Sequence, residues 1–344
     1  MASAAREEGS TSMAKAQALP FPNVPPSGFP MLDREPDFDA ARHLQIERPE
    51  EVRGLSALGY DEAAIVACPT PLAITSPFRI LSDEGAACLI EVCRSLEPYA
   101  RGIERISRMV RGGAYQSRFL RDLCTAPELT EAVSDLCGAP MLPHTIPHQL
   151  GHLNYAPKKV GENVDKWHAD TLRVDFVMFV TDPQSVEGGE FEWFEGTVEE
   201  VRALKEQGKA LPADRIHSVR APGPGWAVLQ QGNMVVHRAK GLNTPGERIT
   251  MVNGYVPADP AFPDFTRFDQ LFLADPEHVA SAEYARHAAW LGRERLRAGV
   301  EALGFTDDRE ALAAELEAVA AMLTGAAGEL RRAGEAGMEH FGDG

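Results

Sequence analysis

The sequence of 344 residues lacks features that mark several special classes of protein. It has no uninterrupted apolar run long enough to cross a bilayer, and its first ten residues have neither the basic nor the apolar stretch of a signal peptide. Basic residues are few, 34 against 51 acidic ones, and the formal charge is −17. Nucleic-acid binding usually needs a basic surface. We therefore expect a cytoplasmic protein with neither a membrane nor a nucleic-acid partner.

Cysteine is also scarce, and its spacing carries no pattern. The five cysteines include no Cys-x-x-Cys pair and no regular framework. Such residues are most often reduced and buried as small hydrophobic side chains. The composition, 44% hydrophobic and 25% charged, is that of a globular chain with room for one large domain or two ordinary ones.

The N-terminal part of the chain divides into two regions. Residues 1–36 are rich in Ala, Ser, Pro and Gly, which predicts a flexible arm. Residues 37–140 carry helical patterns over 78–98 and 127–136, the first with a Ser-Asp-Glu start signal and the second closed by Gly and Pro. We expect a helical region that supports the core.

Residues 141–260 read as the core, because short β-branched and aromatic runs alternate there with Gly and Pro turn signals. The runs lie at 148–156, 172–180, 189–194, 217–221, 226–230, 235–239 and 248–256. This pattern favours a closed or double-sheet antiparallel architecture. The fold class expected is α+β, a mainly β core with flanking helices. Residues 261–344 form a helical extension whose amphipathic spacing would pack on the core or on a second subunit of a homodimer.

One ordered set of residues carries the chemistry: His168 and Asp170 as a His-x-Asp triplet, then His237, then Arg248 with Thr250. Two imidazoles and one carboxylate can occupy one face of an octahedral Fe(II) and leave three positions open. An arginine nearby can hold a dicarboxylate by a two-pronged contact. The triplet alone is a weak signal in a chain with ten histidines and 51 acidic residues, so the order and spacing carry the prediction.

Four segments, in order, resemble the catalytic core of the Fe(II)/2-oxoglutarate-dependent dioxygenases, closest to the prolyl-4-hydroxylase-like branch. They are PFRILSDEGAACLIEVCRSL, HLNYAPKKVGENVDKWHAD, RVDFVMFVTD with GGEFEWF, and APGPGWAVLQQGNMVVHRAKGLNTPGERITMVNGYV. The residues before 75 and after 275 lie outside the resemblance.

The resemblance implies a double-stranded β-helix (jelly-roll) barrel that uses Fe(II), 2-oxoglutarate and O2. The implied iron ligands are His168, Asp170 and His237. The far carboxylate of 2-oxoglutarate would meet Arg248, with Thr250 on the same strand face. Halogenating relatives have a small residue in place of the aspartate, so Asp170 implies an oxygenase outcome.

Tyr155 occupies the place of the family tyrosine that helps to hold that carboxylate, although a buried tyrosine bonded to a backbone carbonyl would give the same pattern. Strand alternation puts Gln149, Gly151 and Leu153 on the face of Tyr155, with His148, His152 and Asn154 pointing away. A bulge would reverse this inference.

Substrate contacts are the least defined part of the site. Arg111 and Arg118 flank a Gly-Gly pair and could clamp a carboxylate or phosphate, or lie on a solvated loop. Trp167 could line the pocket or pack in the core. We expect hydroxylation of an unactivated C–H of a small molecule, an amino acid or natural-product intermediate, with succinate and CO2 as coproducts. The alternatives are a peptidyl (prolyl-type) hydroxylase and a non-catalytic jelly-roll sensor that binds a metal or ligand.

Overall fold

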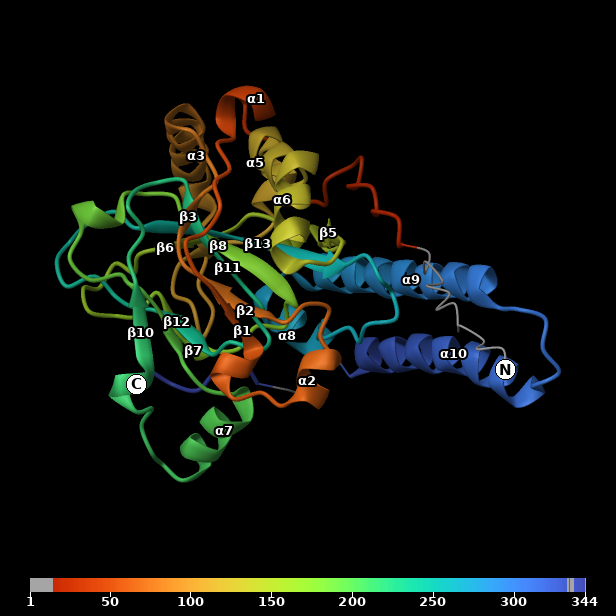
Figure 1. Ribbon diagram of the computed structural model, residues 1–344. Coiled ribbons are helices and arrows are strands. Elements are labelled where there is room, and N and C mark those ends of the chain that lie inside the picture. The colour runs from red at the N-terminus through yellow and green to blue at the C-terminus, as the bar shows by residue number, and fades with distance from the viewer. Residues whose placement is uncertain (1–14, 333, 335–336, 344) are drawn as a thin grey trace, which may run out of the picture.

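The structure is a computed structural model that describes residues 15–332, 334 and 337–343. These residues form a mixed α+β fold with two antiparallel sheets (Figure 1). The larger, nine-stranded sheet contains β1 (Val52–Gly54), β2 (Leu72–Thr75), β3 (Phe78–Arg79), β4 (Met109–Val110), β5 (Met141–Pro143), β6 (His152–Tyr155), β8 (Val174–Phe179), β11 (Trp226–Gln230) and β13 (Ile249–Pro257). The four-stranded sheet contains β7 (Asp165–His168), β9 (Phe191–Phe194), β10 (Ile216–Val219) and β12 (His237–Ala239).

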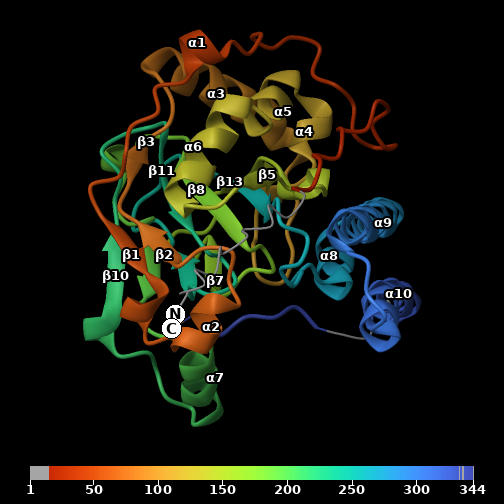
Figure 2. The ribbon, with the colours of Figure 1, turned by 45° about the vertical axis from the view of Figure 1, so that its right-hand side comes forward.

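Helices cover one side of the larger sheet, one helix packs on the smaller sheet, and others lie in the C-terminal part of the described chain (Figures 1 and 2). They are α1 (Ala40–His43), α2 (Glu62–Val66), α3 (Asp83–Leu96), α4 (Gly113–Gln116), α5 (Arg118–Cys124), α6 (Pro127–Cys137), α7 (Val198–Glu206), α8 (Phe268–Ala274), α9 (Glu277–Ala302) and α10 (Arg309–Arg331). Short 3-10 turns are η1 (Leu55–Leu58), η2 (Glu97–Tyr99), η3 (Pro147–Gln149), η4 (Pro183–Ser185) and η5 (Ala213–Arg215). All seven segments expected as strands contain strands.

The strand order of the larger sheet is β1-β2-β11-β8-β13-β6-β4, with β3 paired to β11 and β5 to β13. The order of the smaller sheet is β10-β9-β12-β7. The central strand β8 is buried at all six positions, because helices cover one face and the second sheet covers the other. Several neighbouring strands come from distant parts of the chain, among them β2 and β11, β6 and β13, and β7 and β12.

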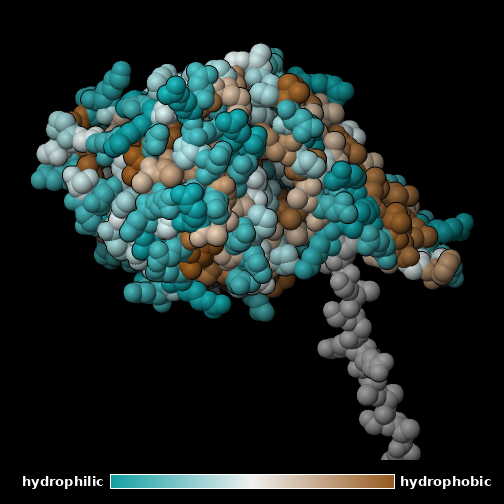
Figure 3. All heavy atoms as spheres, turned by 90° about the horizontal axis from the view of Figure 1, so that it is seen from above, coloured by the Kyte–Doolittle hydropathy of each residue, from teal (hydrophilic) through white to brown (hydrophobic). Residues whose placement is uncertain are grey.

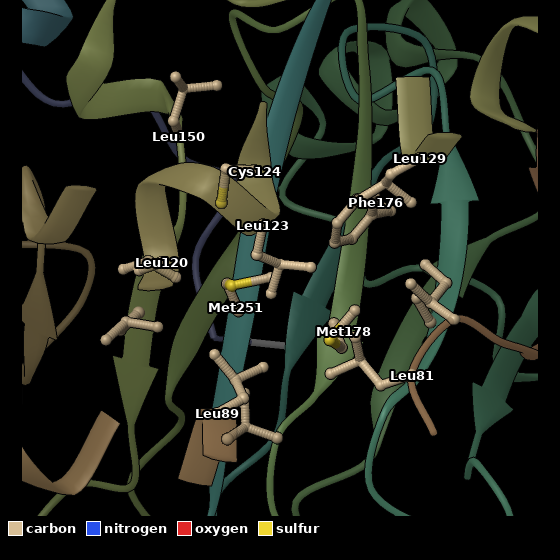
Figure 4. Close-up of a cluster of buried hydrophobic side chains, with 14 of the residues drawn as sticks. Leu81, Leu89, Leu120, Leu123, Cys124, Leu129, Leu150, Phe176, Met178 and Met251 are labelled. Carbon is tan, nitrogen blue, oxygen red and sulfur yellow. The ribbon is translucent and has the colours of Figure 1, made fainter. Parts of the chain in front are cut away.

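The hydrophobic core between the helices and the larger sheet explains how α3, α5 and α6 are held. Figure 4 shows side chains from all three helices meeting Phe176 and Met178 of β8 and Met251 of β13. Ser82 caps α3 by accepting a hydrogen bond from the N–H of Gly85. Gly138 ends α6 in the left-handed conformation, as its place after the helical pattern predicted. The region 37–140, expected as helical, also contributes strands β1 to β4.

The described part of the predicted N-terminal arm follows the surface of the molecule. The N–H of Ala16 donates to the carbonyl of Ala258, and the N–H of Leu32 donates to that of Gln116. Residues 1–14 of the arm lie outside the described residues. The flexible character predicted for residues 1–36 stays a prediction.

Helices α9 and α10 form a pair that projects from the body, and α8 anchors the pair to it (Figures 1 and 2). Figure 3 shows apolar side chains toward this end of the molecule. The exposed large apolar residues on the pair and its connection are Leu296, Val300, Leu303, Phe305, Leu316 and Leu323. In the described part of the chain, α10 alone is long and apolar enough to cross a membrane, and a single such helix is weak evidence. A homodimer through these helices stays a prediction.

After α10, the last described residues return to the smaller sheet (Figure 2). The N–H of Phe341 donates to the carbonyl of Trp167, and the N–H of Trp167 donates to that of Gly342. Residues 341 and 342 therefore extend the smaller sheet beside β7. Met338 and Glu339 of the same segment border a cavity beside β7.

Candidate metal centre and its cavity

Strands β7 and β12 bring the two predicted histidine ligands together. They pair antiparallel, and His168 lies directly across from His237, with ring centres 4.2 Å apart. Asp170 follows β7 and places one carboxylate oxygen 3.2 Å from His168 Nε2 and the other 3.4 Å from His237 Nε2. The three candidate ligand atoms lie within 4.8 Å of one another, so these side chains could hold a metal ion.

Backbone contacts fix the orientation of each ligand. His168 Nδ1 donates to the carbonyl of Lys166 at 2.7 Å, and His237 Nδ1 donates to that of Val235 at 2.9 Å. With Nδ1 protonated, both Nε2 lone pairs face the space between the rings. The N–H of Asp170 donates to Gly232, and a Cβ on that glycine would lie 2.9 Å from Asp170 Cβ. This close approach requires glycine.

The three candidate ligands form one coupled electrostatic group. Burial lowers the pKa of His168, which favours the neutral imidazole. Burial would also lower the pKa of His237, but the carboxylate of Asp170 raises it above its ordinary value. Burial alone would raise the pKa of Asp170, but the two histidines hold it well below its ordinary value. An ionised carboxylate beside two imidazoles favours a cation at this point, and a metal ion would replace the proton on His237.

The centre opens into a cavity of about 100 Å³, and Arg248 lines this cavity. Arg248 is 4% exposed; its Nε donates to the carbonyl of Gly189 at 2.9 Å and its Nη1 to Thr250 Oγ1 at 3.2 Å. Its Nη2 is buried and has no hydrogen-bond partner among the described residues. Burial lowers the pKa of Arg248 to about 10. A buried cation with an open donor is complementary to a carboxylate.

Gly189 makes room for this arginine. Its φ is +75°, in the left-handed region, and a Cβ there would lie 2.9 Å from Leu242 Cδ2 and 3.1 Å from Arg248 Cδ. Both the turn and the space therefore require glycine. The two consecutive glycines, Gly188 and Gly189, are the part of this arrangement that the sequence pattern indicates.

The face of β6 that looks into the cavity carries His152 and Asn154. Asn154 lies across from Thr250 in the β6–β13 register, and its Oδ1 is buried and has no hydrogen-bond partner in the part of the chain that the structure describes. The same holds for Nε2 of His152. These two residues add polar atoms to the wall that carries Arg248.

The prediction for Tyr155 was wrong. Its hydroxyl donates to the carbonyl of Cys93 at 2.7 Å, and its ring packs in the core under α3. Within β6 the predicted alternation holds, because His152 and Asn154 line the cavity while Leu153 and Tyr155 lie in the core. It fails at Gln149, which lies before the turn at Gly151 (φ +60°) and lines the cavity as well.

The structure decides between the alternatives for Arg118 and Trp167. Arg118 lies on the surface beside Glu35, as the solvated-loop alternative expects, and does not line the cavity. The ring of Trp167 packs against the helix side of the smaller sheet, as the packing alternative expects, with Arg238 stacked 4.6 Å from its centre. Arg111 borders the cavity, but its guanidinium is bound on two sides by the carboxylate of Asp275.

Arg105, His152, Asn154 and Asp165 are among the polar residues of the cavity wall that sequence reasoning missed. Asp165 stands three residues before His168, a proximity that could have drawn attention to it. Arg105 stands in a loop with no motif, so nothing in the sequence points to it.

Comparison with known proteins gives remote structural likenesses. No family model and no curated protein matches the chain. The α-ketoglutarate-dependent carbocyclase SnoK from nogalamycin biosynthesis is 17% identical over 61% of this chain and 88% of its own, with a TM-score of 0.42. EctD from S. alaskensis, solved with 2-oxoglutarate and 5-hydroxyectoine, is 17% identical over 67% and 86%, with a TM-score of 0.39. A Pseudomonas putida prolyl-4-hydroxylase is 12% identical over 59% and 98%, with a TM-score of 0.36.

Proposed function

We propose that the protein is an Fe(II)- and 2-oxoglutarate-dependent dioxygenase on a double-stranded β-helix core. It hydroxylates an unactivated C–H of a small molecule and releases succinate and CO2. The main support for the proposal is that two features line the same cavity. A centre of two imidazoles and one carboxylate shares it with a buried arginine whose Nη2 has no partner among the described residues.

The donor set fits iron, and the arginine narrows the assignment. Two histidines and an aspartate also suit a zinc hydrolase with an open position. Such an enzyme needs no buried cation in the same cavity, whereas a keto diacid that chelates iron needs one for its far carboxylate. Iron and 2-oxoglutarate together supply the oxidative chemistry that activates O2. The chain's part is to hold the metal through His168, Asp170 and His237.

Two features of the cavity support a small substrate over a peptide. Helix α8 contributes Leu271 and Ala274 to the wall, and the segment after α10 contributes Met338 and Glu339. A peptide chain would have to pass these elements, whereas a small molecule fits beneath them. The peptidyl hydroxylase and the non-catalytic sensor remain the alternatives, and the intact ligand set favours catalysis over sensing.

The test is spectroscopic. Anaerobic addition of Fe(II) and 2-oxoglutarate should give a visible charge-transfer band, which His168→Ala and His237→Ala should abolish. His278→Ala, on the exposed start of α9, is the matched control and should keep the band. If the unaltered protein gives no band and binds no 2-oxoglutarate, the dioxygenase proposal fails.

A further inference from the structure

An ion pair in the cavity wall is a feature that the proposed chemistry does not use. Arg105 Nε lies 3.0 Å from Asp165 Oδ1, and the side chains are only 16% and 7% exposed. A β-bridge between Ile106 and Asp165 holds the loop of Arg105 against β7. Asp165 Oδ1 also lies 3.6 Å from His168 Nδ1, so the pair stands directly beside a metal ligand.

This pair is close but incompletely satisfied. Arg105 Nε and Asp165 Oδ1 are both buried and face each other at 3.0 Å, but neither makes a hydrogen bond of good geometry among the described residues. Two other arginines that border the cavity are engaged in hydrogen bonds: Arg111 holds Asp275 through two nitrogens, and Arg238 Nε donates to Glu192 at 2.8 Å. A buried ion pair stabilises a protein only when further hydrogen bonds complete it. The pair of Arg105 and Asp165 lacks such bonds among the described residues, and a ligand could supply them.

We propose that Arg105 and Asp165 bind the zwitterionic head of a free α-amino acid, the guanidinium taking its carboxylate and the aspartate its ammonium. The inference rests on the proposed function, because it identifies the substrate class of the same cavity. A planar guanidinium suits a carboxylate, and an ammonium group donates to a carboxylate acceptor.

The wall next to this pair sets the preferred side chain. Ile103, Ile106 and Met109 flank Arg105 in sequence and cluster with Ala274 and Met338. All five residues line the cavity. A substrate whose head meets the ion pair therefore finds an apolar surface beside it, so we expect an amino acid with an apolar side chain.

The pair also predicts what the site rejects. An N-acyl amino acid lacks the ammonium and cannot donate to Asp165. An amino-acid amide lacks the carboxylate and cannot accept from Arg105 as a charged group. Each analogue loses a charge-assisted hydrogen bond to a buried group, so each should bind at least about 10-fold more weakly than the zwitterion.

The experiment titrates the anaerobic Fe(II)/2-oxoglutarate protein with a panel of common L-amino acids and with their N-acetyl and amide forms. Binding is read from the perturbation of the charge-transfer band and by calorimetry, and turnover from succinate release. One or more apolar amino acids should perturb the band and accelerate succinate formation, and their blocked forms should do neither. If the band forms but no free amino acid perturbs it, this inference fails and the dioxygenase proposal stands. If no band forms, the proposed function fails first.

Two variants separate a substrate role from other roles. Arg105→Met and Asp165→Asn should each weaken amino-acid binding about 100-fold while the affinities for Fe(II) and 2-oxoglutarate stay unchanged. Arg215→Met is the matched control, because that guanidinium pairs with Glu200 away from the cavity. An Arg105→Met protein that instead needs more 2-oxoglutarate would make Arg105 a cosubstrate contact. An Asp165→Asn protein that loses Fe(II) but keeps its discrimination would make Asp165 a support for His168. Either result overturns the inference.

Discussion

Replacing Arg248 by methionine gives the most direct measure of the cosubstrate site. Burial lowers the pKa of Arg248 from 12.5 to about 10, so its charged form is about 3 kcal/mol less stable there than in water. A carboxylate placed against the unpartnered Nη2 recovers up to this amount. Because each 1.4 kcal/mol is a factor of ten in affinity, Arg248→Met should raise the Kd of 2-oxoglutarate about 100-fold.

The assay is a calorimetric titration of 2-oxoglutarate into the anaerobic Fe(II) protein, with a separate titration of Fe(II). Arg248 is not among the three candidate metal ligands, so the Fe(II) affinity should change only a few-fold. The matched control is Arg215→Met, because that arginine pairs with Glu200 away from the cavity. It should leave both affinities unchanged.

Two results would refute this reasoning. Equal loss of Fe(II) and 2-oxoglutarate affinity in Arg248→Met would make the arginine a structural support of the centre. Unchanged 2-oxoglutarate affinity would mean that the open Nη2 does not face the carboxylate.

Three further changes test other parts of the structure. Tyr155→Phe should leave 2-oxoglutarate affinity unchanged and lower the free energy of unfolding by about 1–2 kcal/mol through the lost bond to Cys93, measured by urea denaturation. Gly189→Ala should raise the Kd of 2-oxoglutarate, because its Cβ would displace Arg248, and a normal Kd would contradict the packing argument. Asp264 contacts His287, whose charge and hydrogen bond outweigh burial and lower the aspartate pKa from 3.8 to about 2. The ionised carboxylate therefore stabilises the fold above pH 4, and this contribution is lost as the pH falls toward 2. Urea denaturation between pH 4 and pH 2 should show a smaller decrease in the free energy of unfolding for Asp264→Asn than for the unaltered protein.

The sequence predicted the parts of the fold that depend on local patterns. Strand alternation, helix caps and the His-x-Asp spacing are properties of neighbouring residues, so β8, α3 and the metal triad could be located. The direction of a strand face is different, because it depends on which layer packs on each side. Tyr155 and Asn154 alternate as expected, yet only the packed helices decide that Tyr155 belongs to the core.

Residues brought in by tertiary packing could not be found in this way. Arg105 reaches the cavity because its loop forms a bridge with β7, a contact between distant segments without a motif. Trp167 and Arg118 were considered as substrate contacts because of their position in the sequence. Proximity in sequence to a ligand or to a Gly-Gly turn says little about direction, and both side chains point into other surroundings.

The pairing of residues 341 and 342 with Trp167 ties the end of the described chain to the strand that carries His168. Met338 and Glu339 lie in the cavity wall, so a ligand in the cavity can contact this segment when the segment is docked. Ligand binding and docking of the segment are then coupled equilibria. Thermodynamic linkage is reciprocal. A ligand that binds more tightly when the segment is docked must, by the same factor, hold the segment down and shield it from proteases. The rate at which a protease cleaves residues 338–343 should therefore fall as the cavity fills with ligand. This rate measures ligand binding without an activity assay.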